Sequence, residues 1–258
     1  MKIRLLSDLH LEGYFFPYEY KGEDLLILAG DISTARHHGI FELLIEEVPP
    51  TVEIYFVPGN HEYYNGVFEL ENQYFERLQG KYENFTFLNN LGVSFKDIEF
   101  FGGTMFTDFA LDGVSDTWFC RNASKDMIND FHIIRTSKDY GKTGDLRKWS
   151  VADHEEQHKK FIENFEAWVK NTEGKQRIVI SHFMPHPVCT QERFKGSTTN
   201  GYFTCDMSRY FGLMTHWFAG HGHNSIDTVI DDTRLVMNPR GYGSENRGDF
   251  KSDLIIEV

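Results

Sequence analysis

The stretch that decides the fold is KIRLLSDLH, residues 2–10, in which a short apolar run ends abruptly in a serine, an aspartate and a histidine. Short runs rich in Leu, Ile, Val and Phe that enter a polar loop at once are typical of buried strands. The first run covers residues 2–6, and four similar runs cover residues 24–28, 53–57, 177–180 and 216–219. We therefore predict five buried strands, each followed by a polar or glycine-containing loop.

Helical patterns lie between these runs. The clearest covers residues 150–171, where Ser150 can cap the first turn and apolar side chains recur on one face. Two further helices are predicted over residues 67–78 and 39–48. The chain ends in three more strand-like segments, at residues 225–230, 234–237 and 254–258, which indicate a sheet edge or a second sheet. This order predicts one α/β domain over residues 1–258.

Two long stretches show no strong periodicity, at residues 104–146 and 183–204. We expect them to be loops, and loops of this length in a compact domain usually carry function. They are rich in aromatic and polar side chains, so they are candidates for the walls of a substrate pocket.

The loops after the five strand runs hold the residues most suited to chemistry. These are Asp8, His10, Asp31, Asn60, His61, His182, His221 and His223. In an open α/β sheet, functional groups collect outside the carboxyl ends of the strands, so we expect these side chains to meet in one crevice. Imidazoles mixed with carboxylate and amide oxygens favour Mn, Fe, Zn, Co or Ni. Two such ions, roughly 3.5 to 4 Å apart, need a bridging ligand, and the Asp31 carboxylate is our candidate.

The charge of the chain limits the class of substrate. It carries 26 basic and 39 acidic residues, a formal net charge of −13, which should repel polyanions from most of the surface. An extended nucleic-acid surface is therefore disfavoured. A small phosphate ester is still compatible, because bound metal ions reverse the sign of the field locally.

The compartment is predicted from the cysteines and the N-terminal region. Cys120, Cys189 and Cys205 are widely spaced and odd in number, so neither a disulfide framework nor a thiolate zinc pair is indicated. Residues 1–10 resemble no signal peptide, and no apolar run has the length of a membrane span. These features predict a cytoplasmic protein without a membrane partner; they indicate no oligomeric state.

The motifs D-x-H, G-D, G-N-H-E, a lone H after a strand and G-H-x-H, in this order from Asp8 to His223, resemble those of the calcineurin-like metallophosphoesterase superfamily. The resemblance implies a four-layer α/β/β/α sandwich. It also implies a role for each motif residue: Asp8, His10 and His223 would hold one metal, Asn60, His182 and His221 the other, and Asp31 both. His61 would not be a ligand but would act on the phosphate as an acid or electrostatic stabiliser.

Further segments look like a bacterial and phage branch of small phosphoesterases. They lie at residues 101–109, 129–131, 196–200 and 238–242. The chain departs from the protein serine/threonine phosphatases, which carry G-D-x-x-D-R-G. Here Asp31 is followed by Ile32, Ser33, Thr34 and Ala35, so the aspartate that would partner the catalytic histidine and the phosphate-gripping arginine are missing at that place.

The predicted reaction is hydrolysis of a small phosphomonoester or phosphodiester by a hydroxide that bridges two metal ions, with manganese favoured. Candidate substrate-binding residues are His186, Arg240 and Asn200. The sequence leaves open whether Arg240 clamps phosphate or pairs with an acid. Two alternatives are a nuclease of the same superfamily, which the charge disfavours, and a non-catalytic binding scaffold, which the intact ligand set disfavours.

Overall fold

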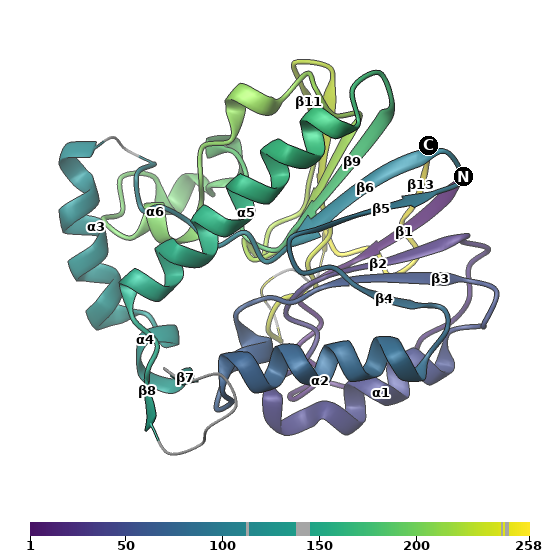
Figure 1. The fold of residues 1–258 in the computed structure, drawn as a ribbon, viewed down its shortest axis with the longest axis horizontal. Coiled ribbons are helices and arrows are strands. Elements are labelled where there is room, and N and C mark those ends of the chain that lie inside the picture. The colour runs from purple at the N-terminus through teal and green to yellow at the C-terminus, as the bar shows by residue number, and fades with distance from the viewer. Residues whose placement is uncertain (112–113, 138–144, 244, 246–247) are drawn as a thin grey trace.

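Two β-sheets lie face to face in the computed structural model, and helices cover the outer face of each (Figure 1). The structure describes residues 1–111, 114–137, 145–243, 245 and 248–258. The predicted α/β/β/α order of layers is confirmed. Among the described residues, no helix has both the length and the apolar character needed to cross a membrane.

The first sheet places the N-terminal strands side by side. Its strands, in spatial order, are β13 (Ile255–Glu257), β1 (Lys2–Leu6), β2 (Leu25–Ala29), β3 (Glu53–Val57) and β4 (Phe85–Phe87). Strands β1 to β4 run parallel, and β13 is antiparallel to β1, which brings the two ends of the chain together. Helices α1 (His38–Glu47) and α2 (Phe68–Lys81) cover its outer face (Figure 1). The carboxyl ends of β1, β2 and β3 therefore open at one edge of this sheet.

The second sheet carries the later strands. In spatial order they are β11 (Ile226–Ile230), β12 (Thr233–Met237), β10 (His216–Ala219), β9 (Gln176–Ser181), β6 (Ile98–Gly103) and β5 (Leu91–Phe95). The inner four are parallel, whereas β11 and β5 are antiparallel edge strands. Asp231 and Asp232 join β11 to β12 with φ of 45° and 65°, the left-handed pair that a two-residue hairpin requires.

Helix α5 (Val151–Asn171) packs on the outer face of the second sheet (Figure 1). The predicted cap is confirmed: the Asp153 amide donates to Ser150 Oγ at 3.3 Å, and the Ser150 amide donates back to the Asp153 carboxylate at 2.8 Å. Phe161, Phe165 and Trp168 form its buried face. The helix is therefore held both at its first turn and along its length.

Strand sequences reflect their position between layers. Phe100, Ile178 and Phe218, which lie in the core between the two sheets, are completely buried. Strands that are covered on both faces can be apolar throughout, which is why β2 reads LLILA without alternation. Strands β4, β5 and β6 are elements that sequence analysis did not identify.

The expectation of a loop over residues 104–146 is wrong for much of that stretch. It contains α3 (Val114–Met127), α4 (Asp130–Ile133), β7 (Arg135–Ser137) and the first residue of β8 (Leu146–Lys148), while residues 112–113 and 138–144 lie outside the described part. Trp118 and Phe119 on α3 are 63% and 58% exposed. Because its largest apolar side chains face solvent, α3 lacks the periodicity that reveals a helix.

Residues 183–204 are mostly irregular, as predicted, with only short helical turns. These and the remaining short helices are η1 (Ala35–His37), η2 (His61–Tyr63), η4 (Pro187–Cys189), η5 (Glu192–Phe194), α6 (Asn200–Phe203) and η6 (Ser208–Tyr210). Helix α6 lies against α3 (Figure 1). Residues 184–204, together with the end of α3, form a wall beside the carboxyl ends of the strands.

Candidate active site

The loops at the carboxyl ends of β1, β2 and β10 have a strained backbone. Five residues with side chains adopt left-handed φ there, namely Asp8 (51°), His10 (47°), Asp31 (54°), His221 (68°) and His223 (48°). Such conformations cost of order 1–3 kcal/mol each and persist only where the surroundings enforce them. All five are predicted metal ligands, so the backbone of the candidate site is strained at each of them.

Two glycines allow the loops to approach each other. Gly30 has φ of 82°, and a Cβ there would lie 2.3 Å from His182 Nδ1. A Cβ on Gly59 would lie 2.1 Å from Asp31 Oδ1. Only glycine fits at these two positions.

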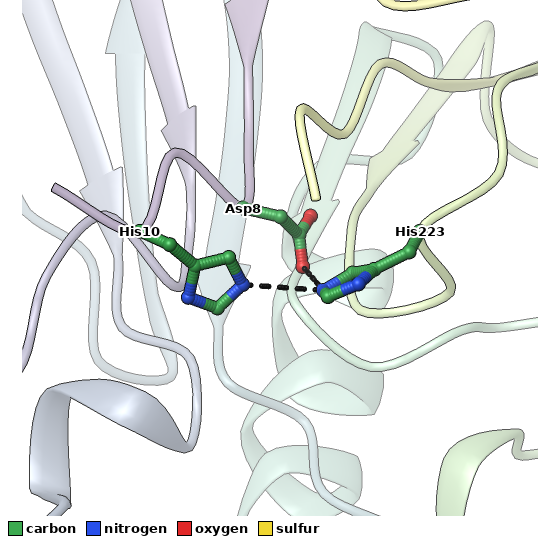
Figure 2. A group of neighbouring side chains, drawn as sticks. All are labelled: Asp8, His10 and His223. Carbon is green, nitrogen blue, oxygen red and sulfur yellow. Dashed lines mark hydrogen bonds and ion pairs between the residues drawn. The ribbon is translucent and has the colours of Figure 1, made fainter. Parts of the chain in front are cut away.

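Asp8, His10 and His223 form the first group of side chains (Figure 2). His10 Nε2 lies 3.2 Å from His223 Nε2, and His223 Nε2 lies 3.4 Å from Asp8 Oδ1. Asp8 and His10 follow β1 of the first sheet, whereas His223 follows β10 of the second sheet. The group therefore joins the two sheets.

Asp31, His182 and His221 form the second group, and Asn60 lies beside them. His182 Nε2 is 3.2 Å from His221 Nδ1, 3.3 Å from Asp31 Oδ1 and 3.3 Å from Asn60 Oδ1. The two groups adjoin, because the His221 amide donates to both oxygens of Asp8, at 3.0 and 3.1 Å. The structure thus brings together all seven residues that were predicted as metal ligands.

In three of the imidazoles, the contact made by Nδ1 supports a metal-binding role. In each, Nε2 faces a neighbouring ligand-type side chain while Nδ1 is held by an oxygen atom. These pairs are His10 with Glu12 at 3.2 Å, His223 with Glu245 at 2.6 Å, and His182 with the Ala29 carbonyl at 2.9 Å. A metal-ligating histidine usually has this second contact, which fixes its tautomer and ring orientation. The donor set therefore fits divalent ions such as Mn or Zn.

The carboxylates and imidazoles of the site shift one another's pKa values. Burial alone would raise the pKa of Asp31, but the charges of His182 and His61 hold it well below its usual range. Burial lowers and Asp31 raises the pKa of His182, with a net value of about 9. At His223, burial lowers the pKa, but the hydrogen bond and the charge of Asp8 outweigh this effect and raise it to about 9. Without cations the cluster thus retains protons on two of its imidazoles.

Glu62 holds the turn at the end of β2. Its buried carboxylate accepts hydrogen bonds from four backbone amides, those of Asp31, Ile32, Ser33 and Gly59, at 2.6 to 3.0 Å. Burial, followed by the charge of Asp31, raises the pKa of Glu62 to about 7. Glu62 therefore supports the loop that presents Asp31, as expected for a carboxylate behind the ligands.

Asp130 orients the amide of Asn60. It is completely buried, and its carboxylate accepts hydrogen bonds from Asn60 Nδ2 at 2.9 Å, Tyr64 at 2.9 Å and Tyr202 at 2.6 Å. Because Nδ2 is engaged there, Oδ1 of Asn60 is the atom that faces His182. Burial raises the pKa of Asp130, although these three donors oppose the shift.

His61 lies next to both groups. Its Nε2 is 3.0 Å from the Tyr242 hydroxyl and 3.9 Å from Asp31 Oδ2, and its ring packs against Tyr64. Its Nδ1 is buried, 3.6 Å from Glu12. Glu12 therefore lies where a carboxylate can orient His61, although the motif that would supply an aspartate partner is missing.

A cavity of about 540 Å³ opens beside the cluster. Asp31, Asn60, His61 and the two histidines after β10 line its floor. Its walls are partly apolar, from Met127, Ile128, Met184, Phe194 and Phe203. The loops at residues 183–204, predicted to face the substrate, provide much of this wall.

The three candidate substrate residues differ in position. Asn200 lines the cavity, although its amide donates to the Phe194 carbonyl at 2.7 Å. His186 is not among the lining residues, and its ring packs against Phe211. Arg240 donates to the carbonyls of residues 9, 14 and 15, so it fastens the segment after β1, and it pairs with no acid among the described residues. Contact of any of the three with substrate stays a prediction.

Sequence analysis missed the acidic partners of the site. Glu12 could have been suspected, because it lies two residues after His10 as His10 lies two after Asp8. Asp130 belongs to a segment that was noticed but given no role. No local pattern marks Glu245, because it lies outside the strand-like segments and the motifs of the sequence.

Comparisons with known proteins agree with this geometry. A family model described as calcineurin-like phosphoesterase matches residues 1–225. An uncharacterized protein of Acanthamoeba polyphaga mimivirus is 24% identical over 283 residues, covering 99% of this chain and 96% of that protein. The crystal structure of a phosphopantetheinyl hydrolase from Mycobacterium tuberculosis matches with a TM-score of 0.74 at 15% identity, covering 100% of this chain and 95% of that one. A putative 5′-nucleotidase from Staphylococcus aureus matches with a TM-score of 0.50 at 14% identity, covering 93% of this chain and 49% of that one. The structural matches show a shared fold.

Proposed function

Because this chain belongs to the calcineurin-like phosphoesterase family and is a phosphoric ester hydrolase, we propose that it cleaves a small phosphate ester at a pair of divalent metal ions. The observation that carries the proposal is the meeting of seven ligand-type side chains in two adjoining groups, four of which, Asp31, Asn60, His221 and His223, line a cavity. Membership of a bacterial and phage branch stays a prediction.

Each group offers a complete set of donors for one ion. Asp8, His10 and His223 would hold the first ion, and Asn60, His182 and His221 the second. Asp31 contacts the second group directly, and we assign it as the ligand shared with the first. Bound there, two ions would supply Lewis acidity toward the phosphoryl oxygens and a water nucleophile at neutral pH. Manganese is our preferred metal, since imidazole and oxygen donors are mixed.

His61 is assigned the role of acid. Its Nε2 is on the cavity side, beside the Tyr242 hydroxyl, so it can give its proton to the oxygen of the departing group. Glu12 lies behind Nδ1 and favours the protonated ring. His61 is therefore placed to act on the leaving group, whereas Asn60, its neighbour in sequence, turns toward the metal ligands.

The cavity suggests an ester with an organic group. Its volume of about 540 Å³ exceeds what a phosphate alone needs, and apolar side chains form part of its walls. The net charge of −13 argues against a polyanionic substrate. Because Cys120, Cys189 and Cys205 are all buried thiols, we also propose a reducing compartment such as the cytoplasm.

Metal analysis combined with two model substrates tests this function. The purified protein should contain close to two equivalents of metal and should hydrolyse nitrophenyl phosphate or bis-nitrophenyl phosphate, and the preferred one tells monoesterase from diesterase. Asp31→Ala should lose most of the bound metal and most of the activity. His132→Ala is the matched control and should retain both, because the exposed His132 ring contacts the carbonyl of residue 126 and lies away from the cluster. Normal turnover in Asp31→Ala would refute the proposal.

A further inference from the structure

A second cluster of ligand-type side chains lies outside the phosphoesterase site. Asp108 follows β6, His158 is on α5, and Cys205 follows α6. Cys205 Sγ lies 3.8 Å from His158 Nε2 and 4.0 Å from Asp108 Oδ1, and the three ligand atoms are all within 4.8 Å of one another. Three elements that are distant in sequence thus converge on one point.

These separations lie near the upper limit for hydrogen bonds to sulfur, and they are close to the spacing of ligand atoms around a shared cation. Bond lengths to zinc of 2.0–2.3 Å at tetrahedral angles place neighbouring ligand atoms about 3.6 Å apart. The two separations from Cys205 Sγ exceed this value by only a few tenths of an ångström, and the third, between Asp108 and His158, is within 4.8 Å. A small adjustment of side chains would therefore complete the coordination.

His158 is already oriented as a ligand. Its Nδ1 donates to the Met105 carbonyl at 3.1 Å, so the lone pair of Nε2 points toward Cys205. The ring is only 8% exposed, and burial lowers its pKa, which keeps the imidazole in the neutral form that binds metals. One turn earlier on α5, His154 Nε2 accepts the amide of Thr107 at 3.0 Å. The segment before Asp108 is therefore anchored to the same helix at two points.

We propose that Asp108, His158 and Cys205 form a second metal site, separate from the phosphoesterase cluster, which takes Zn²⁺ or a similar thiophilic ion. Sulfur, imidazole and carboxylate donors together select such ions over Mg²⁺ or Ca²⁺. Asp108 lies at the solvent boundary, so water can supply the fourth ligand.

Binding requires the thiol of Cys205 to lose its proton. Burial raises the pKa of this thiol, so the metal must displace the proton and its affinity increases with pH. The bound ion would tie the loop after β6 and helix α5 to the segment after α6. Phe203 and Thr204, next to Cys205, line the cavity, so the site would stiffen one wall of the active site.

Cobalt titration of the full-length chain tests the proposal, because a thiolate bound to Co²⁺ gives a charge-transfer absorption in the near ultraviolet. The phosphoesterase cluster contains only nitrogen and oxygen donors, so it gives none. We expect the band in the unmodified chain, its loss in Cys205→Ser and its retention in Cys120→Ser. Zinc should abolish the band by competition.

Asp108→Asn provides a second test at the solvent boundary, where a substitution does not disturb the packing of the core. It should weaken cobalt binding at this site by tenfold or more while nitrophenyl phosphate turnover at the other site continues. Absence of the band at saturating cobalt, its persistence in Cys205→Ser, or unchanged affinity in Asp108→Asn would each overturn the proposal.

Discussion

At the scale of single residues, adjacent side chains in this protein are directed to different tasks. Asn60 and His61 are neighbours on one tight turn, yet Asn60 Oδ1 faces His182 whereas His61 Nε2 faces the Tyr242 hydroxyl. The turn separates them because successive side chains on it diverge. This arrangement predicts that His61 can be replaced without loss of the metal ions that Asn60 would help to hold.

The first prediction concerns His61→Gln. The variant should keep its metals and lose a factor of about 10² to 10⁴ in turnover of an alkyl phosphate, because an alkoxide needs a proton to leave. A nitrophenyl phosphate should lose far less, since nitrophenolate leaves unaided. Steady-state rates on both substrates and metal analysis provide the measurement. Loss of metal would make His61 a ligand, and equal losses on both substrates would contradict the role of acid.

The second prediction is proton release on metal loading. In the metal-free protein the pKa values of His182 and His223 are raised to about 9, so both rings are protonated at pH 7. A metal binds neutral imidazole, so loading at pH 7 should release about two more protons than loading well above pH 9, where only metal-bound water has a proton to lose. Calorimetric titration in two buffers with different ionisation enthalpies measures this. Heats that do not depend on the buffer at pH 7 would contradict it.

At the scale of elements, short helices act as supports for the site. Helix α4 supplies Asp130 and α6 supplies Tyr202, and their hydrogen bond at 2.6 Å joins two segments that sequence analysis treated as parts of loops. The same carboxylate fixes the amide of Asn60. Two helices of only four residues each thus determine the orientation of one candidate ligand.

The third prediction tests this support. Asp130→Asn preserves the shape of the side chain but replaces one acceptor oxygen with a donor, so it should allow the Asn60 amide to turn. We expect metal affinity to fall roughly 10- to 100-fold. Asp126→Asn, on the exposed end of α3, is the control and should bind metal normally. Chelator competition measures the affinity, and equal values for the two variants would show that Asp130 has no such role.

At the scale of the whole molecule, the site is shared between the two sheets. Asp8, His10, Asp31 and Asn60 follow strands of the first sheet, and His182, His221 and His223 follow strands of the second. Each group takes ligands from both sheets, so bound ions would cross-link the layers. Metal binding should therefore stabilise the fold as well as permit the reaction.

The fourth prediction follows from this cross-link. Removal of metal with a chelator should lower the melting temperature and abolish hydrolysis, and Mn²⁺ at about 100 times its Kd should restore about 2.7 kcal/mol for each ion bound. Mg²⁺ should restore less, because it prefers shells of oxygen atoms. Differential scanning calorimetry and turnover provide the two readouts. Full activity in excess chelator would contradict the metal dependence, and an unchanged melting temperature would contradict the cross-link.

The sequence by itself determined the five strands that lead to the candidate site and the candidate ligands that follow them. Strands such as β1 and β3 are short apolar runs that end at a polar residue, so both the element and its terminal side chain are local signals. The motif order from Asp8 to His223 also indicated the family, which the comparison over residues 1–225 shows.

Only the tertiary structure decided which residues support those ligands. Glu245 contacts His223 across a separation of 22 residues, and Asp130 contacts Asn60 across 70 residues. Periodicity in the sequence does not reveal contacts at such separations. Helix α3 escaped detection because its large apolar side chains are exposed, and Arg240 proved to hold backbone carbonyls of a distant loop. Local sequence encodes the burial pattern of an element, whereas the partners of a polar side chain depend on where the packed layers place the rest of the chain.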